Sequence, residues 1–430
     1  MVFQRGAATL LITSLLLAGV LMIVMGSYKA LFYQMKQSQN EVESRRAHWH
    51  AEGGLECAIS SVVGKQDIPE ELNDCQIQLS LDALKIETGT PHIVRATSGF
   101  LTLSKSFLLP ELQIKSPITT TSHLLVNGGL NIAPHVNQRV SEFRWACTSV
   151  RYQNTFYAHS YDTIHPYQAT DISRYFPESH GSGLHQCSTT HYTDFSWQLA
   201  LTQNDFEHVE QLDVFQEVFN VPRSHWFEVM SDTSLFGYVP EELKSVMPRL
   251  PSELPSAQYI ENCGQQITEL IKAYHELIWV YGSCELNADD LQSINLAIDT
   301  HLNGGLILVL HNGIASISGN QALKAMIYHF VSESPSAGFV DWGQSNNNPL
   351  LSALIASLNE HALLNTVEQQ KVSYFQSGNV YPLGGLVLDA PDSYALINND
   401  LYMQFNKDVT ASAARHFHKV KWSNGSWHDF

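Results

Sequence analysis

An uncharged apolar segment near the start of the chain limits what this sequence can fold into. It runs from Ala7 to Tyr28 (AATLLITSLLLAGVLMIVMGSY). At about 1.5 Å per residue, a helix of this length crosses a hydrocarbon core of ~30 Å. No proline occurs before Pro69, so nothing in the sequence interrupts a helix that continues past the apolar segment. We therefore expect a transmembrane segment over residues 7–28, within one long helix over residues 7–63.

The second part of this helix has an amphipathic pattern. Apolar residues recur at helical spacing between charged ones, which predicts one face that another part of the protein covers. The apolar set is Leu31, Met35, Val42, Trp49, Leu55, Ile59 and Val62. Gly53 and Gly54 each cost about 1 kcal/mol of helix stability, so they indicate a bend or the close approach of another backbone segment.

Residues 1–60 resemble the N-terminal region of type IV pilus minor pilins of the PilX/GspK-like group. The resemblance rests on the leader MVFQRG, the run ATLLITSLLLAGVL and the string AEGGLECAI. It implies a prepilin leader over residues 1–6, cut after Gly6 by a prepilin peptidase, with an N-methylated Ala7 as the mature N-terminus. Most pilins have a glutamate at the fifth mature position, which pairs with a neighbouring subunit's terminal amine. Here that position is Leu11, which resembles the tip-placed members of the family.

The resemblance also implies partners and a location. The partners would be other minor and major pilins through the N-terminal helix, the prepilin peptidase and the inner-membrane assembly platform. The chain would span the inner membrane once, with a periplasmic head, and would be extracellular in the pilus after assembly. A plain signal anchor and a cleaved secretory signal are the alternatives, although a signal has a shorter apolar core of about 7–15 residues. Positive-inside counting does not orient the segment, because basic residues lie on both sides of it.

The chain is acidic, which bears on its partners. Lys and Arg number 24 against 42 Asp and Glu, a formal net charge of −18. Such a surface repels phosphate, so nucleic acid and anionic membrane surfaces are unfavourable partners. The C-terminal stretch ARHFHKVKWSNGSWHDF mixes basic and aromatic residues, a combination that binds single-stranded nucleic acid in other proteins. Against the negative background we expect a closing strand with buried aromatic residues instead.

The six cysteines suit an oxidising compartment and disulfide bonds. They are Cys57, Cys75, Cys147, Cys187, Cys263 and Cys284, and they form neither a CxxC motif nor zinc-finger spacing. Six cysteines allow many pairings. The simplest joins nearest neighbours, with each bond contributing roughly 3–4 kcal/mol in the chain-entropy model. Buried free thiols are the alternative.

Residues 65–120 predict a small pilin-like sheet against the helix. Alternating apolar residues suggest strands at residues 77–81, 92–96 and 100–104. The stretch 112–121, which ends in three threonines, has the composition of a linker.

Residues 121–430 predict a mainly-β head, so the fold class is α+β. The string HLLVNGGLNI after Ser122 resembles later strings that begin near residues 277, 301, 377 and 394. Repeated strand–turn–strand units favour a β-solenoid, and an ordinary β-sandwich is the alternative. Residues 140–260 have the composition of an insertion, where binding is commonly located. Helices are expected at residues 205–220, 258–276 and 349–368.

No catalytic motif is present, and we expect neither enzyme activity, a cofactor nor a metal. The sequence has no P-loop, GxGxxG, HExxH or GxSxG pattern. Five histidines with Asp162 have spacings of no known metal motif; they are His159, His165, His180, His185 and His191. Turn residues Asp389, Asp392 and Asp400 offer carboxylates suited to Ca²⁺, and ordinary turn chemistry explains them as well.

These observations favour a function in pilus assembly or initiation, at the fibre tip. The first alternative is a tip adhesin or uptake receptor that binds a surface, a glycan or DNA through residues 140–260. A signal-anchored periplasmic enzyme acting on polysaccharide is a third hypothesis, because many β-solenoids cleave such substrates.

Overall fold

The computed structural model divides the chain into two compact units. One comprises residues 1–109 and 420–430, and the other comprises residues 110–419. The described residues are 5–65, 68–69, 71–87, 91–108, 114–141, 143–164, 186–332, 341–359, 367–418, 420–423, 425 and 428–429. The first unit holds the long apolar helix and a small sheet, and the second is a mostly β head that also contains helices.

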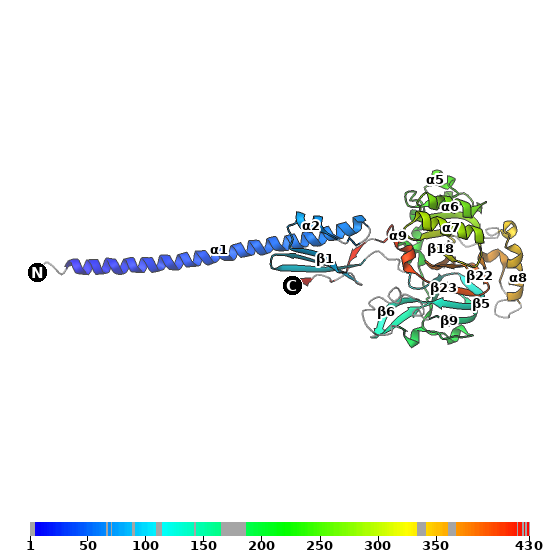
Figure 1. The fold of residues 1–430 in the computed structure, drawn as a ribbon, viewed down its shortest axis with the longest axis horizontal. Helices are drawn as coiled ribbons and strands as arrows, with labels where there is room; N and C mark the ends of the chain where they lie inside the picture. The colour runs from blue at the N-terminus through cyan, green and yellow to red at the C-terminus, as the bar shows by residue number, and fades with distance from the viewer. Residues whose placement is uncertain are drawn as a thin grey trace. The chain divides into compact units, whose positions relative to one another are not determined.

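The first unit is built on one long helix. α1 runs from Arg5 to Lys65 over 61 residues, and is the long blue helix in Figure 1. The other elements of this unit are α2 (Asn73–Gln78), β1 (Ala83–Glu87), β2 (His92–Ser98), β3 (Leu101–Leu108), β24 (Lys421–Trp422) and β25 (His428–Asp429). The strands form an antiparallel sheet in the order β1-β2-β3-β24, and β25 also pairs with β3. The expected single helix and small sheet are therefore both present.

Only the C-terminal part of α1 is covered by this sheet. Ala51, Leu55, Ala58 and Val62 lie one or two helical turns apart and are fully buried. They pack against alternate residues of β2 and β3 in one apolar cluster, which includes Val94, Ala96, Leu103 and Phe107. Burying one face of α1 therefore fixes the sheet on the helix.

Gly54 lies where the helix and the sheet approach most closely. A Cβ atom at Gly54 would lie 2.6 Å from Leu81 Cδ1 and 3.2 Å from Ala96 Cβ. At Gly53 the nearest atoms would be 3.5 Å away, on Leu79, which is ordinary contact. The sequence had indicated either a bend or the close approach of another backbone segment at this glycine pair. The structure shows a close approach at Gly54, but the approaching atoms belong to the side chains of Leu81 and Ala96.

A disulfide joins α1 to the segment that follows it. Cys57 and Cys75 are bonded, with their Cα atoms 5.8 Å apart. Cys75 lies in α2, which replaces the strand expected at residues 77–81. That expectation was wrong, because the alternation of Ile77, Leu79 and Leu81 belongs to a helical turn and the residues that leave it.

The chain returns to the first unit at its end. Trp422 of β24 makes an edge contact with Phe107, with ring centroids 6.3 Å apart, and the Lys105 ammonium lies 4.0 Å from the centroid of the Trp422 ring. The expected closing strand is confirmed for residues 421–422. The head is therefore an insertion between β3 and β24. The expected boundaries at 120 and 430 differ from the observed ones at 109 and 419, because Ile118–Thr120 form a buried strand, not a linker.

The head contains most of the strands. They are β4 (Ile118–Thr120), β5 (His123–Ala133), β6 (His135–Ser141), β7 (Arg144–Thr148), β8 (Val150–Tyr152), β9 (Phe156–Thr163), β10 (Gln186–Cys187), β11 (Phe206–His208), β12 (Gly237–Val239), β13 (Gln258–Tyr259), β14 (Leu277–Leu286), β15 (Leu306–His311), β16 (Ala315–Ser318), β17 (Ala322–Leu323), β18 (Ala325–Phe330), β19 (Val372–Ser377), β20 (Tyr381–Pro382), β21 (Leu386–Asp389), β22 (Tyr394–Asn398) and β23 (Leu401–Gln404). All the repeated strings of the sequence lie in or next to these strands.

Most of these strands form two runs of parallel neighbours. One run is β11-β8-β4-β21-β18-β15-β14, and the other is β14-β16-β19-β22-β5-β9. Strands β4, β8, β15, β18 and β21 of the first run are each followed along the chain by a strand of the second run. We call each such pair of consecutive strands, one from each run, a level of the stack. A sandwich of antiparallel sheets does not fit this pairing.

The levels do not follow the order of the sequence. From β14 they run through residues 306–318, 325–377 and 386–398, and then continue with residues 118–133 and 150–163. The first strands of the head therefore pair with its last strands. The sequence had suggested one continuous insertion over residues 140–260. That prediction was wrong, because β8 and β9, which lie within this range, form one level of the stack.

Alternate residues of each strand build the core between the two runs. Leu306, Leu308 and Leu310 lie in this core, whereas Ile307 and Val309 face a second apolar cluster on the other side of the strand. β14 belongs to both runs because it turns at Gly282, where φ is +132°. A Cβ atom at Gly313, on the next level, would lie 2.1 Å from the Gly282 carbonyl carbon, so the two corners stack without side chains.

Helices cover the outer faces and one end of the stack. They are α3 (Val214–Phe219), α4 (Trp226–Met230), α5 (Glu242–Ser245), α6 (Cys263–Lys272), α7 (Ala288–His301), α8 (Asn348–Asn359) and α9 (Ala411–Ala414), and Figure 1 shows α6 and α7 side by side. The helices expected at residues 205–220, 258–276 and 349–368 are present as the shorter α3, α6 and α8. α3 begins late because Asp213 caps it by accepting from the Gln216 amide.

The two adjacent glycines of α1 give a test of this packing. We expect Gly54→Val to destabilise the first unit by about 1–3 kcal/mol, because its side chain would overlap Leu81 and Ala96. Gly53→Ala is the matched control and should stabilise α1 by up to about 1 kcal/mol. Hydrogen–deuterium exchange of β2 and β3, measured on the full chain in detergent, reports both effects. Equal exchange in the two variants would contradict the assigned close approach.

Candidate functional site

The first half of α1 has the properties of a membrane segment. In the part of the chain that the structure describes, one helix is long and apolar enough to cross a membrane. Its span is Thr9–Val63, and its most apolar window has a mean hydropathy of 2.4 with no residue buried. Its length and composition fit a membrane anchor or a signal sequence.

Two hydroxyl groups of this segment are satisfied within the helix. The Thr13 hydroxyl donates to the carbonyls of Thr9 and Leu10, and the Ser14 hydroxyl donates to that of Leu11. Leu11 is 61% exposed. Gly6 and Ala7 lie in the first turns of α1. The segment therefore exposes apolar side chains, and the hydroxyl groups of Thr13 and Ser14 are paired within it.

The head contains a polar cavity of about 780 Å³. It is lined by Lys115, His135, Asn137, Gln138, Ala146, Thr148, His191, Asn204, Phe206, Glu207 and His208. These residues come from β6, β7, β11, the segments around His191 and Asn204, and the stretch before β4, which holds Lys115. A cavity of this volume is within the range of small-molecule sites.

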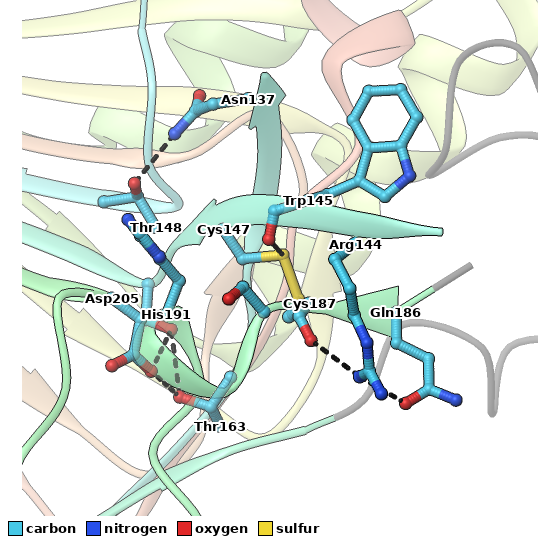
Figure 2. Close-up of a disulfide and its surroundings, with 12 residues drawn as sticks. Asn137, Arg144, Trp145, Cys147, Thr148, Thr163, Gln186, Cys187, His191 and Asp205 are labelled. Carbon is cyan, nitrogen blue, oxygen red and sulfur yellow. Dashed lines mark hydrogen bonds between the residues drawn. A yellow bond between two sulfur atoms is a disulfide. The ribbon is translucent and has the colours of Figure 1, made fainter. Parts of the chain in front are cut away.

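Three interactions hold the walls of the cavity (Figure 2). Cys147 and Cys187 are bonded, with Cα atoms 5.6 Å apart, and join β7 to β10. The Asn137 amide donates to the Thr148 hydroxyl at 2.7 Å, between β6 and β7. The third is the set of hydrogen bonds made by the buried carboxylate of Asp205. Asp205 lies between Asn204 and Phe206 in the sequence, and both of these residues line the cavity.

Asp205 ties together three parts of the head. Its carboxylate accepts from the Thr193 amide at 3.0 Å and from the Thr193 hydroxyl at 2.6 Å. It also accepts from the hydroxyls of Thr163, at the end of β9, and Ser149, between β7 and β8. A buried carboxylate with this many donors has little freedom to move, so the cavity wall is fixed in place.

The same segment displays an aromatic pair to solvent. Trp197 is 70% exposed and Phe195 is 48% exposed, and their rings meet edge to face at 4.7 Å between centroids. Phe195 has a φ of +48°, which is strained for an aromatic residue. Ser196, between them, exchanges two backbone hydrogen bonds of 2.8 Å with Tyr161. Exposed aromatic residues on an anchored loop commonly mark a contact surface.

A buried acid lies on another side of the head. Asp389 is fully buried. It receives the Arg223 Nε–H at 3.0 Å, the Tyr328 hydroxyl at 2.8 Å and the Thr121 hydroxyl at 3.3 Å. Burial raises the pKa of Asp389 above its usual value, while the Arg223 charge and these hydrogen bonds oppose the rise. Asp389 therefore has a structural partner, and Asp400 likewise accepts from the Gly129 amide, so ordinary turn and core contacts explain both acids.

The structure places the remaining candidate residues as follows. All six cysteines are paired with their nearest neighbours, and the third bond is Cys263–Cys284. His165, His180 and His185 lie outside the described residues. Across the described ranges, no group of three or more His, Cys, Asp or Glu residues is arranged to hold a metal ion. His159 makes an edge contact with Tyr157, and His191 lines the cavity.

Sequence reasoning missed the residues that build the cavity. Asp205 was expected at a helix start, and the amides and Lys115 of the cavity belong to no motif. Comparison with protein families, with curated proteins and with solved structures finds no match to this chain.

The Asp389–Arg223 pair predicts a pH-dependent stability. Because the folded-state pKa of Asp389 is raised, its contribution is most favourable at low pH and is lost as the pH rises through that pKa. We expect Arg223→Leu to lower the free energy of unfolding at neutral pH by about 3 kcal/mol or more, since it leaves a buried charge unpaired. Part of this loss should be recovered as the pH falls from neutral towards 3.8, the ordinary Asp value.

Urea unfolding followed by tryptophan fluorescence over this pH range checks the prediction. The double variant Arg223→Leu/Asp389→Asn should lose the pH-dependent recovery. Lys371→Leu is the matched control, because Lys371 forms an exposed pair with Glu368 at 3.5 Å and should change stability by at most about 1 kcal/mol. The same pH response in the single and double variants would contradict the role given to Asp389.

Proposed function

We propose that the chain is a minor pilin-like subunit that takes part in type IV pilus assembly or initiation. The observation that carries the proposal is the two-part character of α1. Its first half is apolar and exposed on all sides, and its second half is covered on one face by a small antiparallel sheet. An uncovered apolar half needs lipid or other helices as neighbours, and the resemblance at residues 1–60 favours other pilins.

In this proposal the helix exchanges lipid for other pilin helices. Lipid offers no hydrophobic gain for helix association, so close packing must drive it. Gly19 and Gly26 suit such packing, since a Cβ atom at either position would meet nothing within 4 Å in this chain. Before assembly the protein lies in the inner membrane with a periplasmic head, where the prepilin peptidase removes residues 1–6 and the assembly platform engages it. After assembly it lies in the extracellular pilus.

Leu11 supports a place at the fibre tip. An ionisable residue within an apolar segment is costly unless it is paired. A subunit at the tip needs no glutamate to pair with the terminal amine of a subunit above it, so leucine is tolerated there. This function is assembly, without catalysis.

We propose further that the head is a β-solenoid. Its support is the parallel pairing of equivalent strands at successive levels, together with stacked asparagines at the corners. Asn320 Oδ1 accepts from the Asn379 amide at 2.8 Å, and Asn379 Oδ1 accepts from the Tyr402 amide at 3.0 Å. Such ladders recur where identical turns stack on each other.

The exposed pair Phe195 and Trp197 favours one second candidate function, a tip adhesin. Both residues lie in residues 140–260, where binding was expected. An adhesin would use the fibre for display and would not be needed to make it.

Fibre counts in a strain that lacks this gene test the proposed function. We expect the strain to make few or no fibres, and expect the wild-type gene to restore them. Fibres in normal number without the gene would contradict the assembly role.

The double variant Phe195→Ser/Trp197→Ser separates the two functions. Assembly predicts normal fibre numbers and normal attachment, whereas the adhesin predicts normal fibres and reduced attachment. Tyr274→Ser is the matched control, because Tyr274 is a 72% exposed aromatic residue elsewhere on the head.

A further inference from the structure

We propose that the cavity lined by Lys115, Gln138 and Asn204 is a saccharide-binding site. This inference concerns the head alone and does not depend on the assembly role. It assigns a class of ligand to the cavity, whose presence is explained neither by the proposed assembly role nor by the exposed pair Phe195 and Trp197.

The side chains of the cavity match the chemistry of sugar hydroxyl groups. Each sugar hydroxyl both donates and accepts, so its natural partners are groups that do both, such as amides and neutral imidazoles. The lining includes the amides of Asn137, Gln138 and Asn204 and three imidazoles. Within the described part of the chain, the side chains of Gln138, Asn204 and Lys115 have no hydrogen-bond or ion-pair partner, so they are available to a ligand.

The charges of the cavity argue against a strongly anionic or cationic ligand. Among the described residues of the lining, the one carboxylate is that of Glu207, which is paired with Arg151 at 3.3 Å. Burial, with Lys407 nearby, lowers the pKa of His135 to about 4, so this imidazole is neutral at physiological pH and can both donate and accept. Lys115 is the one cation in the described lining. A neutral sugar or one with a single carboxylate fits this balance better than a nucleic acid does.

The cavity is also rigid enough to bind a weakly interacting ligand. The Cys147–Cys187 bond, the Asn137–Thr148 hydrogen bond and the Asp205 contacts fix three walls before any ligand arrives (Figure 2). A preformed site avoids the entropy cost of ordering its side chains on binding.

Saturation-transfer NMR on the purified full chain tests the proposal. The protein is kept in a detergent without a sugar headgroup, and the probes are glucose, galactose, N-acetylglucosamine and glucuronate at about 10 mM, well above the millimolar dissociation constants typical of weak sites. We expect saturation transfer to at least one of these sugars. No transfer to any of them would overturn the proposal.

Matched variants locate the site. Gln138→Leu/Asn204→Leu should reduce the affinity for the bound sugar about tenfold or more, the equivalent of about 1.4 kcal/mol. Both residues are exposed, so the fold should be retained, and circular dichroism checks this. Gln292→Leu on the exposed face of α7 is the control and should leave binding unchanged. Equal binding by both variants would overturn the assignment of the cavity.

Lys115→Ala distinguishes the classes of ligand. We expect it to weaken glucuronate more than the neutral sugars. Binding of a single-stranded DNA oligomer that depends on Lys115, with no transfer to sugars, would overturn the proposal in favour of nucleic acid. Because these measurements use purified protein, their outcome is independent of whether the gene is needed for fibres.

Discussion

The structure depends on the burial of one face of α1 by the small sheet. Ala51, Leu55, Ala58 and Val62 find apolar neighbours in β2 and β3, and the Cys57–Cys75 bond holds the chain that follows the helix against it. The first half of the helix has no such cover. This asymmetry connects the fold to the proposed function, because the uncovered half remains available to lipid or to other apolar helices.

The head is attached to this unit as an insertion, and its internal order explains how the chain can leave and return. β4 and β21 pair directly, so the first strands of the head lie beside its last ones. A stack whose levels ran in the order of the sequence would place its first and last strands at opposite ends. The observed order places them next to each other, as an insertion between β3 and β24 favours.

Much of the fold could be predicted from the sequence. The apolar run and the amphipathic residues after it predicted α1, and the strings near residues 122, 277, 301, 377 and 394 predicted strands that pair in the structure. The order of the levels could not be predicted, because local patterns define strands but not which strand pairs with which. The strand expected at residues 77–81 was wrong for a related reason. Alternation over so few residues also fits a short helix, and the bond to Cys57 then fixes Cys75 within α2.

The candidate sites were less accessible to sequence reasoning. Asp205 lies in a stretch with a helical pattern, and its role comes from Thr163 and Thr193, which only the fold brings to it. From the sequence, Asp389 fits either a calcium ligand or an ordinary turn residue, and only the fold brings Arg223 beside it. In both cases a single acidic residue gains its role from partners that are distant in sequence.

The mature N-terminus tests the central claim most directly. The account predicts that the protein from cells with prepilin peptidase lacks residues 1–6 and begins with N-methylated Ala7, and that cells without the peptidase retain the full leader. Intact mass and N-terminal sequencing measure both. A chain that keeps Met1–Gly6 in both kinds of cell, or one that is cut elsewhere, would contradict the account.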